Sequence, residues 1–241
     1  MIVAVLSDIH ANLEALESVL ADCEHEGAEQ YWCLGDVVGY GADPDAVVDR
    51  VRALGGPTVA GNHDWAACGQ TSTRHFNRHA AFAAEWTANN MRAENLDWLR
   101  ALPLIERREG VLLVHATPSD PAAWHYCMQV DDALDEMEAF REDMCMIGHS
   151  HVPGAFERHD EDVRYTRAEE LVLRPGRRYL VNVGSVGQPR DRDARAAYLL
   201  FDTAENRLRH VRVPYDVARA QEKILAAGLP PWLASRLAAG D

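Results

Sequence analysis

Short apolar runs alternate with amphipathic stretches along the first quarter of the chain. The run IVAVLS (2–7) predicts a strand, and apolar positions that recur every three or four residues predict a helix over 12–27. A second strand is expected over 30–35, a second helix over 43–56 and a third strand over 57–61. This β-α-β-α-β order favours a largely parallel sheet that is covered by helices.

A different pattern follows. A helical pattern covers much of 65–102 and stops at Pro103, which predicts a helical insertion beside the sheet. Beyond the insertion we expect hairpin-like strands over 104–116, a helix over 131–143 and a buried strand over 144–148.

The last third of the chain changes character again. From residue 153 on, short alternating segments predict a second, mainly antiparallel sheet that packs on the first. A helical tail over about 215–241 closes the chain. Because there is no internal repeat and no low-complexity linker, we expect residues 1–241 to form a single domain of two sheets flanked by helices.

Composition limits the kind of partner. The formal net charge of −14 argues against stable nucleic-acid binding through a basic surface. It does not exclude an anionic substrate, because cations gathered in one cleft can reverse the local field. The 5 cysteines are scattered without C-x-x-C spacing, so we expect reduced, mostly buried thiols rather than a disulfide frame or a zinc knuckle.

The N-terminal sequence and the lengths of the apolar runs indicate where in the cell the protein is expected. The N-terminal sequence MIVAVLSDIH has no basic segment before its apolar run, and it carries a charge at position 8, which argues against a secretory signal. No apolar stretch is long enough to cross a bilayer. We therefore expect a cytoplasmic protein without a membrane partner. Whether it forms a homo-oligomer stays open.

Aspartate, asparagine and histidine follow five of the predicted strands. In chain order these residues are Asp8 with His10, Asp36, Asn62 with His63 and Asp64, His115, and His149 with His151. In open α/β sheets, ligands bind at the carboxyl ends of the strands. Glycine directly precedes Asp36, Asn62 and His149, and it allows the backbone to bend sharply and approach closely.

The spacing and the donor types point to metal ions. Residues i and i+2 of an extended segment point to the same side, so Asp8 and His10 can face one ion. The same spacing holds for His149 and His151, although a turn there could direct them to two ions. Two carboxylates, one amide and four imidazoles suit manganese, iron, zinc, cobalt or nickel better than calcium. Seven donors are more than one tetrahedral ion can bind. Their number fits two ions that share a bridging carboxylate.

These motifs resemble those of the calcineurin-like metallophosphoesterase superfamily. The pattern D-x-H, G-D, G-N-H-[DE], H and G-H-x-H occurs in that order over residues 1–151. The segment NVGSVGQPRD (182–191) and the helical insertion are similar to the bacterial and archaeal phosphodiesterase-like branch. The resemblance implies an α/β fold, a four-layer α/β/β/α sandwich of two mixed β-sheets flanked by helices.

The resemblance also implies roles for the residues. It divides the seven ligands between two ions, with one carboxylate shared: Asp8, His10 and His151 on the first, Asn62, His115 and His149 on the second, and Asp36 between them. His63 would act as the general acid, and Asp64 would orient or tune it. A hydroxide that bridges two divalent transition-metal ions would attack phosphorus without a covalent enzyme intermediate. Mn²⁺ is favoured, with Fe, Zn, Ni or Co as alternatives.

We therefore expect a metal-dependent phosphoric ester hydrolase that acts on a small phosphodiester. The acidic surface and the absence of an added docking domain favour small substrates over phosphoproteins. A phosphomonoesterase or a dinucleoside polyphosphate hydrolase is the nearest alternative. A non-catalytic scaffold of the same fold should have lost ligands or the acid, and a nuclease would be confined to short oligonucleotides by the chain's negative charge.

Three further side chains are weighed as substrate contacts. His75 and His79 lie four residues apart in the insertion, and we interpret them as ordinary exposed histidines rather than as lid residues that contact a substrate phosphate. Arg190, with Asp191, is interpreted as part of a solvated loop rather than of the cleft.

Overall fold

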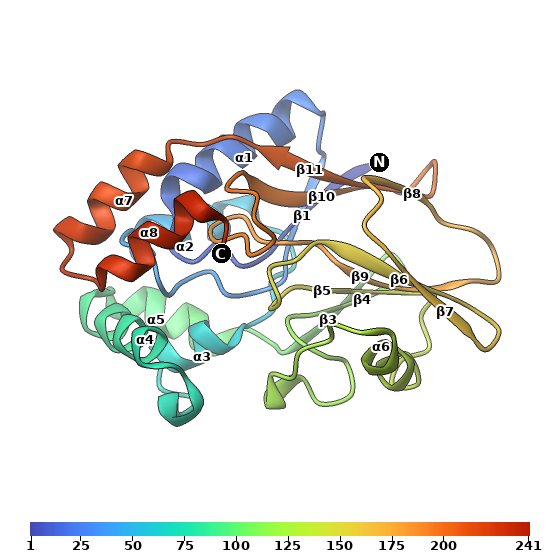
Figure 1. The fold of residues 1–241 in the computed structure, drawn as a ribbon, viewed down its shortest axis with the longest axis horizontal. Coiled ribbons are helices and arrows are strands. Elements are labelled where there is room, and N and C mark those ends of the chain that lie inside the picture. Colours follow the sequence, from blue (N-terminus) through green and yellow to red (C-terminus); the bar gives the residue numbers. More distant parts are fainter.

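The computed structural model describes residues 1–241 and contains two β-sheets stacked face to face (Figure 1). Sheet A consists of β1 (Ile2–Leu6), β2 (Gln30–Cys33), β8 (Glu170–Val172), β10 (Ala196–Asp202) and β11 (Arg207–Val213). Sheet B consists of β3 (Ile105–Arg108), β4 (Val111–Val114), β5 (Met144–Ile147), β6 (Gly154–His159), β7 (Asp162–Thr166) and β9 (Arg178–Asn182). Their strand orders are β2-β1-β10-β11-β8 and β3-β4-β5-β9-β6-β7.

Both sheets are mixed. In sheet A, β1 runs parallel to β2 and antiparallel to β10. In sheet B, β4, β5 and β9 are parallel, and β3 and β6 flank them in the antiparallel direction. The expected pair of mixed sheets is confirmed. The expectation that the strands from residue 153 on form a second sheet of their own is wrong, because β10 pairs with β1 and β9 pairs with β5.

Helices cover the outer faces of the two sheets (Figure 1). The helices α1 (Leu13–His25) and α2 (Pro44–Leu54) pack on sheet A, and α6 (Val130–Met137) packs on sheet B. A second group of helices gathers at one end of the molecule: α3 (Asn62–Ala67), α4 (Arg78–Asn90), α5 (Ala93–Ala101), α7 (Val217–Ala226) and α8 (Pro231–Ala239). Two short 3-10 turns complete the elements, η1 (Thr73–His75) and η2 (Pro121–Ala123).

Alternate side chains of one strand enter different layers of the core. In β1, Val5 joins Trp32 in the layer between the sheets, whereas Leu6 packs against α1 and α2. In β5, Met146 enters the layer between the sheets, whereas Cys145 packs against α6. Because both faces are covered, these strands have continuous apolar sequences instead of an alternating pattern. All five cysteines are free and buried, as expected.

The predicted third strand over 57–61 shrinks to one parallel bridge between Thr58 and Cys33. Cys33 donates its N–H to the Pro57 carbonyl at 2.9 Å, and the carbonyl of Cys33 accepts from the N–H of Val59 at 3.0 Å. The chain then leaves the sheet, since the N–H of Ala60 donates to the Pro103 carbonyl. This early departure lets α3 begin at Asn62, next to the end of β2.

We expect residues 1–241 to unfold as one domain, because sheet A joins strands from both ends of the chain, with β1 beside β10. Trp32, which is fully buried between the sheets, reports on the central layer. In urea titrations, the summed fluorescence of the 6 tryptophans, Trp32 among them, and the far-ultraviolet circular dichroism should change at the same midpoint. Two separate midpoints would divide the chain into independent units and contradict the prediction.

Candidate metal centre

The seven expected ligands converge at the carboxyl ends of the strands. Asp8 follows β1, Asp36 follows β2, His115 follows β4 and His149 follows β5. All seven side chains are buried, with exposed fractions of at most 7%. Six of them form two groups whose donor atoms lie close enough to share an ion: Asp8 with His10 and His151, and Asp36 with His115 and His149.

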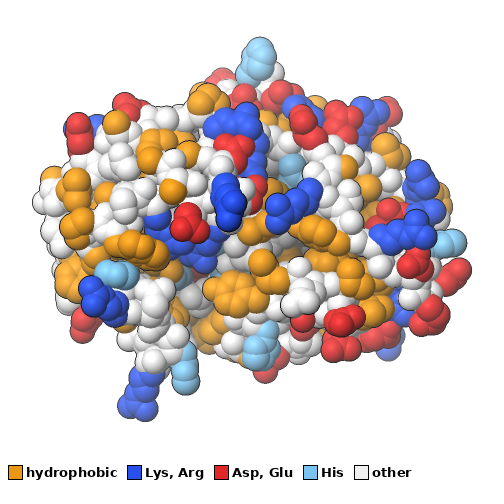
Figure 2. All heavy atoms as spheres, in the orientation of Figure 1, with side chains coloured by type: hydrophobic (Ala, Val, Ile, Leu, Met, Phe, Trp, Pro, Cys, Tyr) orange, Lys and Arg blue, Asp and Glu red, His pale blue; other side chains and the backbone are white.

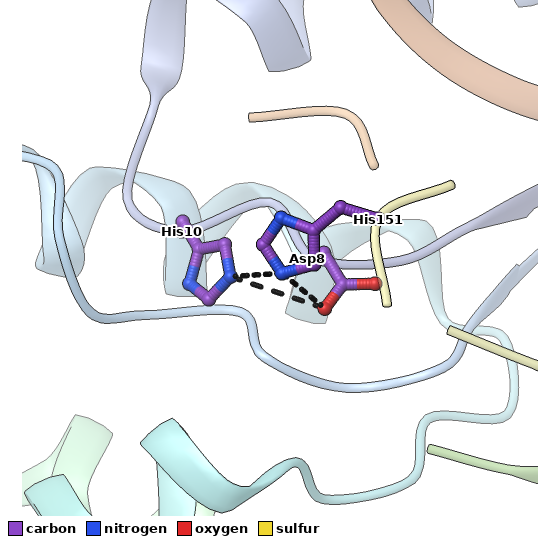
Figure 3. A group of neighbouring side chains, drawn as sticks. All are labelled: Asp8, His10 and His151. Atoms are coloured by element: carbon purple, nitrogen blue, oxygen red, sulfur yellow. Dashed lines mark hydrogen bonds and ion pairs between the residues drawn. The ribbon is translucent and has the colours of Figure 1, made fainter. Parts of the chain in front are cut away.

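In the first group the three side chains face one another (Figure 3). The Nε2 atoms of His10 and His151 lie 3.2 Å apart. Oδ1 of Asp8 lies 3.1 Å from Nε2 of His151 and 3.9 Å from Nε2 of His10. This arrangement leaves room for one ion between a carboxylate oxygen and two ring nitrogens.

Asp36 lies between the two groups. Its Oδ2 is 3.4 Å from Nε2 of His115 in the second group and 3.7 Å from Nε2 of His10 in the first. Its other oxygen, Oδ1, accepts the backbone N–H of His63 at 2.8 Å. One carboxylate oxygen is therefore fixed by the first turn of α3, and the other is directed at both groups.

Backbone carbonyls set the tautomers of the histidines. The carbonyls of Val38, Leu34 and Gln188 lie 3.1, 2.7 and 2.5 Å from Nδ1 of His10, His115 and His151, respectively. A carbonyl only accepts, so each Nδ1 must carry a hydrogen, and in the neutral ring each Nε2 then presents a lone pair to the centre. The lone pairs of His10 and His151 would repel each other at 3.2 Å without a cation between them.

The remaining histidine uses its other nitrogen. Nε2 of His149 donates to the carbonyl of Trp124 at 2.9 Å, which leaves Nδ1 free as the donor atom. Oδ1 of Asp8, Oδ1 of Asn62 and Nε2 of His115 are buried without a hydrogen-bond partner. Buried donors and acceptors without partners are costly unless something else satisfies them. The two groups therefore fit a binuclear centre of divalent metal ions.

The backbone at these residues is not extended. Asp8, His10, Asp36, His149 and His151 all adopt left-handed conformations, with φ between 49° and 64°. Such conformations cost about 1–3 kcal/mol each in non-glycine residues and cluster at functional sites. We expected Asp8 and His10 to face one ion because their segment would be extended, and this reason is wrong. Left-handed residues direct Asp8 and His10 to one group, and they divide His149 and His151 between two groups.

Charge within the cluster favours metal ligation. Burial by itself would raise the pKa of Asp8 and of Asp36, but the neighbouring histidines lower both. Burial lowers the pKa of His149 to about 3. Burial acts in the same direction on His115, yet the Asp36 carboxylate raises its pKa to about 9. Ligands bind metal in their deprotonated forms, so an ion on His115 would displace one proton.

The two expected catalytic residues lie at the start of α3. His63 is buried against the rings of Tyr40 and Phe76, with centroid distances of 4.3 and 4.9 Å. Burial lowers its pKa to about 4, although the charge of Asp36 acts in the opposite direction. A negatively charged substrate would favour the protonated form.

Asp64 does not hydrogen-bond to the His63 ring. Its carboxylate accepts the backbone N–H groups of Gly61 at 2.9 Å and of Val38 at 3.1 Å. These bonds tie the start of α3 to the loop after β2, so Asp64 holds the backbone that carries His63. Burial, followed by the charge of Asp36, raises the pKa of Asp64 to about 7.

A cavity of about 450 Å³ opens over the two groups. Arg190 lines it, so its assignment to a solvated loop is wrong. His75 is exposed and also lines the cavity, whereas the ring of His79 stacks on Trp232 with a centroid distance of 4.9 Å. Figure 2 shows this face of the molecule, where lysine and arginine side chains gather near the middle.

Two supporting residues escaped the sequence reasoning. Trp124 has a left-handed backbone (φ 57°), and its carbonyl holds His149. Tyr126 stacks on the His149 ring with a centroid distance of 4.2 Å, although its side chain is 53% exposed. Both lie after η2, in a segment without a strand-end motif. Only the tertiary contact with His149 reveals their position.

Gly148 lies where no side chain fits. A Cβ atom there would be 2.0 Å from Oγ of Ser7 and 2.6 Å from Oδ2 of Asp8. We expect Gly148→Ala to lower the free energy of unfolding by about 1–3 kcal/mol through overpacking, and to weaken metal binding because Asp8 must move. Urea unfolding and metal titration measure the two effects.

The matched control is Gly176→Ala. Gly176 has φ +77° and no atom within 4 Å of an added Cβ. The control should therefore lose only the cost of a left-handed alanine, about 1–2 kcal/mol, and bind metal normally. Equal metal binding by both variants would contradict the predicted displacement of Asp8.

Comparisons with known proteins agree with this geometry. Residues 1–206 match the calcineurin-like phosphoesterase superfamily domain. An uncharacterised protein of Methanocaldococcus jannaschii is 41% identical over 99% of this chain and 98% of its own length. The crystal structure of a metallophosphoesterase from Sphaerobacter thermophilus superposes with a TM-score of 0.88, at 39% identity, over 100% of this chain and 99% of that one.

A more distant relative carries a specific activity in its name. The symmetrical bis(5'-nucleosyl)-tetraphosphatase of Erwinia tasmaniensis is 30% identical over 50% of this chain and 45% of its own length. None of the helices of the present chain combines the length and the apolar composition needed to span a bilayer. From the domain match, the near full-length relative and the two ligand groups, we conclude that the chain belongs to the calcineurin-like phosphoesterase superfamily.

Proposed function

We propose that this protein hydrolyses a small phosphodiester with the help of two divalent transition-metal ions. The observation that carries the proposal is the set of inward-facing donor atoms without partners, which lie beneath a cavity of about 450 Å³. Candidate metal ligands at the base of an open cavity are suited to binding a small anionic substrate. The net charge of −14 makes a long nucleic acid a poor fit.

The division of ligands follows the two groups. Asp8, His10 and His151 would hold one ion, while Asn62, His115 and His149 would hold the other, with Asp36 shared between them. When bound, the ions supply Lewis acidity toward the phosphoryl oxygens and lower the pKa of water. Mn²⁺ is our preferred ion for this mixed nitrogen and oxygen set. Elemental analysis of the purified protein tests its identity.

The chain itself contributes proton transfer and positioning. His63 lines the cavity beside the ligands, and we assign it the donation of a proton to the leaving oxygen. Asp64 positions His63 through its bonds to the backbone of Gly61 and Val38. Tyr40 and Phe76 pack against the His63 ring and limit the water around it.

Hydrolysis of chromogenic esters tests the proposal. With Mn²⁺ present, bis-p-nitrophenyl phosphate should be hydrolysed faster than p-nitrophenyl phosphate, since the proposed substrate is a diester. Removal of metal with a chelator should abolish the activity, and restored Mn²⁺ should recover it. Inertness toward both esters while two ions per chain are bound would rule out the proposed phosphodiesterase and, together with inertness toward a dinucleoside tetraphosphate, would favour a scaffold of the same fold.

A dinucleoside polyphosphate is the second candidate substrate. The observation in its favour is the similarity to the symmetrical bis(5'-nucleosyl)-tetraphosphatase, which covers about half of each chain. Each internal phosphorus of such a compound has two ester or anhydride links, as in a diester. Chromatography of the products from a dinucleoside tetraphosphate would test this candidate directly.

A further inference from the structure

Arg190 lies on the wall of the cavity above the two ligand groups. Among the 16 residues that line this cavity it is the only lysine or arginine, and Asp36 is the only carboxylate. Arg190 comes from the loop between β9 and β10, far in sequence from most of the ligands. No step of the proposed reaction uses it.

The side chain is held in place relative to the first ligand group. Its backbone N–H donates to the His151 carbonyl at 3.3 Å, and its Nη2 donates to Oε1 of Gln188 at 2.9 Å. Gln188 is 1% exposed, and its own carbonyl accepts from the His151 ring. The guanidinium also lies over the Tyr40 ring, 5.9 Å from its centroid. One network therefore fixes both Arg190 and a metal ligand.

The charge of Arg190 is not balanced by a carboxylate. The acidic residues of the same loop are already paired, Asp191 with Arg212 and Asp193 with Arg195. Nε of Arg190 is buried and has no hydrogen-bond partner. A guanidinium stays charged and carries five donors, so a buried donor without an acceptor favours an anionic ligand.

A second arginine adds to the positive charge on this side. Burial lowers the pKa of Arg236 to about 10, and the charge of Arg190 contributes next. Arg236 stacks on Trp232 and donates to the Asp241 carbonyl, and it forms no ion pair with a side-chain carboxylate. Arg236 lies outside the lining of the cavity and has Asp241 as an acidic neighbour, so only Arg190 presents an unpaired guanidinium there.

We propose that Arg190 binds a second negative charge of the substrate, beyond the single charge of a simple phosphodiester. This inference rests on the phosphoesterase activity proposed above and narrows its substrate class. In this proposal the reacting phosphoryl group would face the candidate metal ligands at the base of the cavity. Arg190 offers a planar set of donors that matches the oxygens of a second phosphate. Within the proposed diester class, this second charge comes from a neighbouring phosphate of a phosphoanhydride. A preference for the doubly ionised monoester would instead revise the proposed substrate class.

Substrates that differ in charge test the role of Arg190. The Mn²⁺-loaded wild type, Arg190→Gln, Arg190→Lys and Arg192→Gln are compared after elemental analysis has shown equal metal content. The substrates are bis-p-nitrophenyl phosphate with one charge, p-nitrophenyl phosphate with two, and a dinucleoside tetraphosphate with charged neighbouring phosphates. Arg192 is the matched control, because it is exposed, lies outside the cavity and is two residues away in the same loop.

Arg190→Gln should lower kcat/KM about 10- to 100-fold for at least one of the two highly charged substrates, mainly through KM, and less than about 3-fold for the single-charge diester. The substrate that shows the loss identifies the source of the charge. Arg190→Lys should recover part of the activity, and Arg192→Gln should behave like the wild type. An equal loss on all three substrates, or no loss, would overturn the inference.

Binding measurements separate this inference from the proposed activity. Calorimetry compares inorganic phosphate, which carries about two charges, with dimethyl phosphate, which carries one. Arg190→Gln should bind inorganic phosphate about 10- to 100-fold more weakly and dimethyl phosphate normally. If the wild type hydrolyses no ester yet shows this difference, the proposed function fails and the role of Arg190 stands. If the wild type hydrolyses esters without any such difference, the proposed function stands and the role of Arg190 fails.

Discussion

The Asp36→Asn variant is expected to hydrolyse esters at least about 1,000-fold more slowly than the wild type and to retain at most one ion per chain. Oδ2 of Asp36 is directed at both groups, 3.4 Å from His115 and 3.7 Å from His10. An amide in its place removes one negative charge from between two cations, and the cations then repel each other. Both readouts, elemental analysis and hydrolysis of bis-p-nitrophenyl phosphate, should change together.

The fold should survive this substitution. Oδ1 of Asp36 accepts the His63 N–H, and an asparagine oxygen can accept the same bond. Asp131→Asn, at an exposed position in α6, makes the same chemical change far from the site and serves as the control. Two ions per chain in Asp36→Asn, at wild-type affinity, would show that Asp36 is not the shared ligand.

His63→Ala should lower kcat by about 100- to 10,000-fold while both ions stay bound, because the expected loss is that of a general acid. The loss should depend on the leaving group. An alkoxide needs a proton when it leaves, whereas p-nitrophenolate needs one much less. A poor leaving group should therefore show the larger effect, which a loss of structure alone would not produce.

His75→Ala is the matched control for this variant. His75 lines the same cavity but is exposed on η1, and no reaction step is assigned to it. Its activity should stay within about 3-fold of the wild type. If the metal content of His63→Ala fell in parallel with its activity, His63 would be supporting the centre and would not be the acid.

The sequence predicted which side chains come together as candidate ligands better than the architecture around them. Each ligand follows an apolar run, and this local signal survives any rearrangement of the strands. The partition of strands between the sheets was not predictable in the same way. β10 pairs with β1 and β9 with β5 through backbone hydrogen bonds, which residues of almost any type can form, so periodicity carries no information about which strand is the neighbour. The segment 57–61 was similarly apolar, yet it forms only one bridge.

The residues that hold the histidines in place could not be predicted from the local sequence either. Nothing in the local sequence marks Trp124 or Gln188 as the residues whose carbonyls hold His149 and His151, because any residue has a backbone carbonyl. Arg190 was wrongly placed in solvent, outside the cavity, since its neighbours in sequence are charged and polar. Its place in the cavity follows from the return of the chain after β9 to the first ligand group.

The sequence by itself determined the candidate donors of this protein: their types, their order and their positions at the ends of apolar runs. The tertiary structure alone decided how these donors are shared between two groups and which nitrogen each histidine presents. The physical reason is that donor type is a property of one side chain. Sharing and orientation depend instead on left-handed backbone at His149 and His151 and on carbonyls supplied by distant segments.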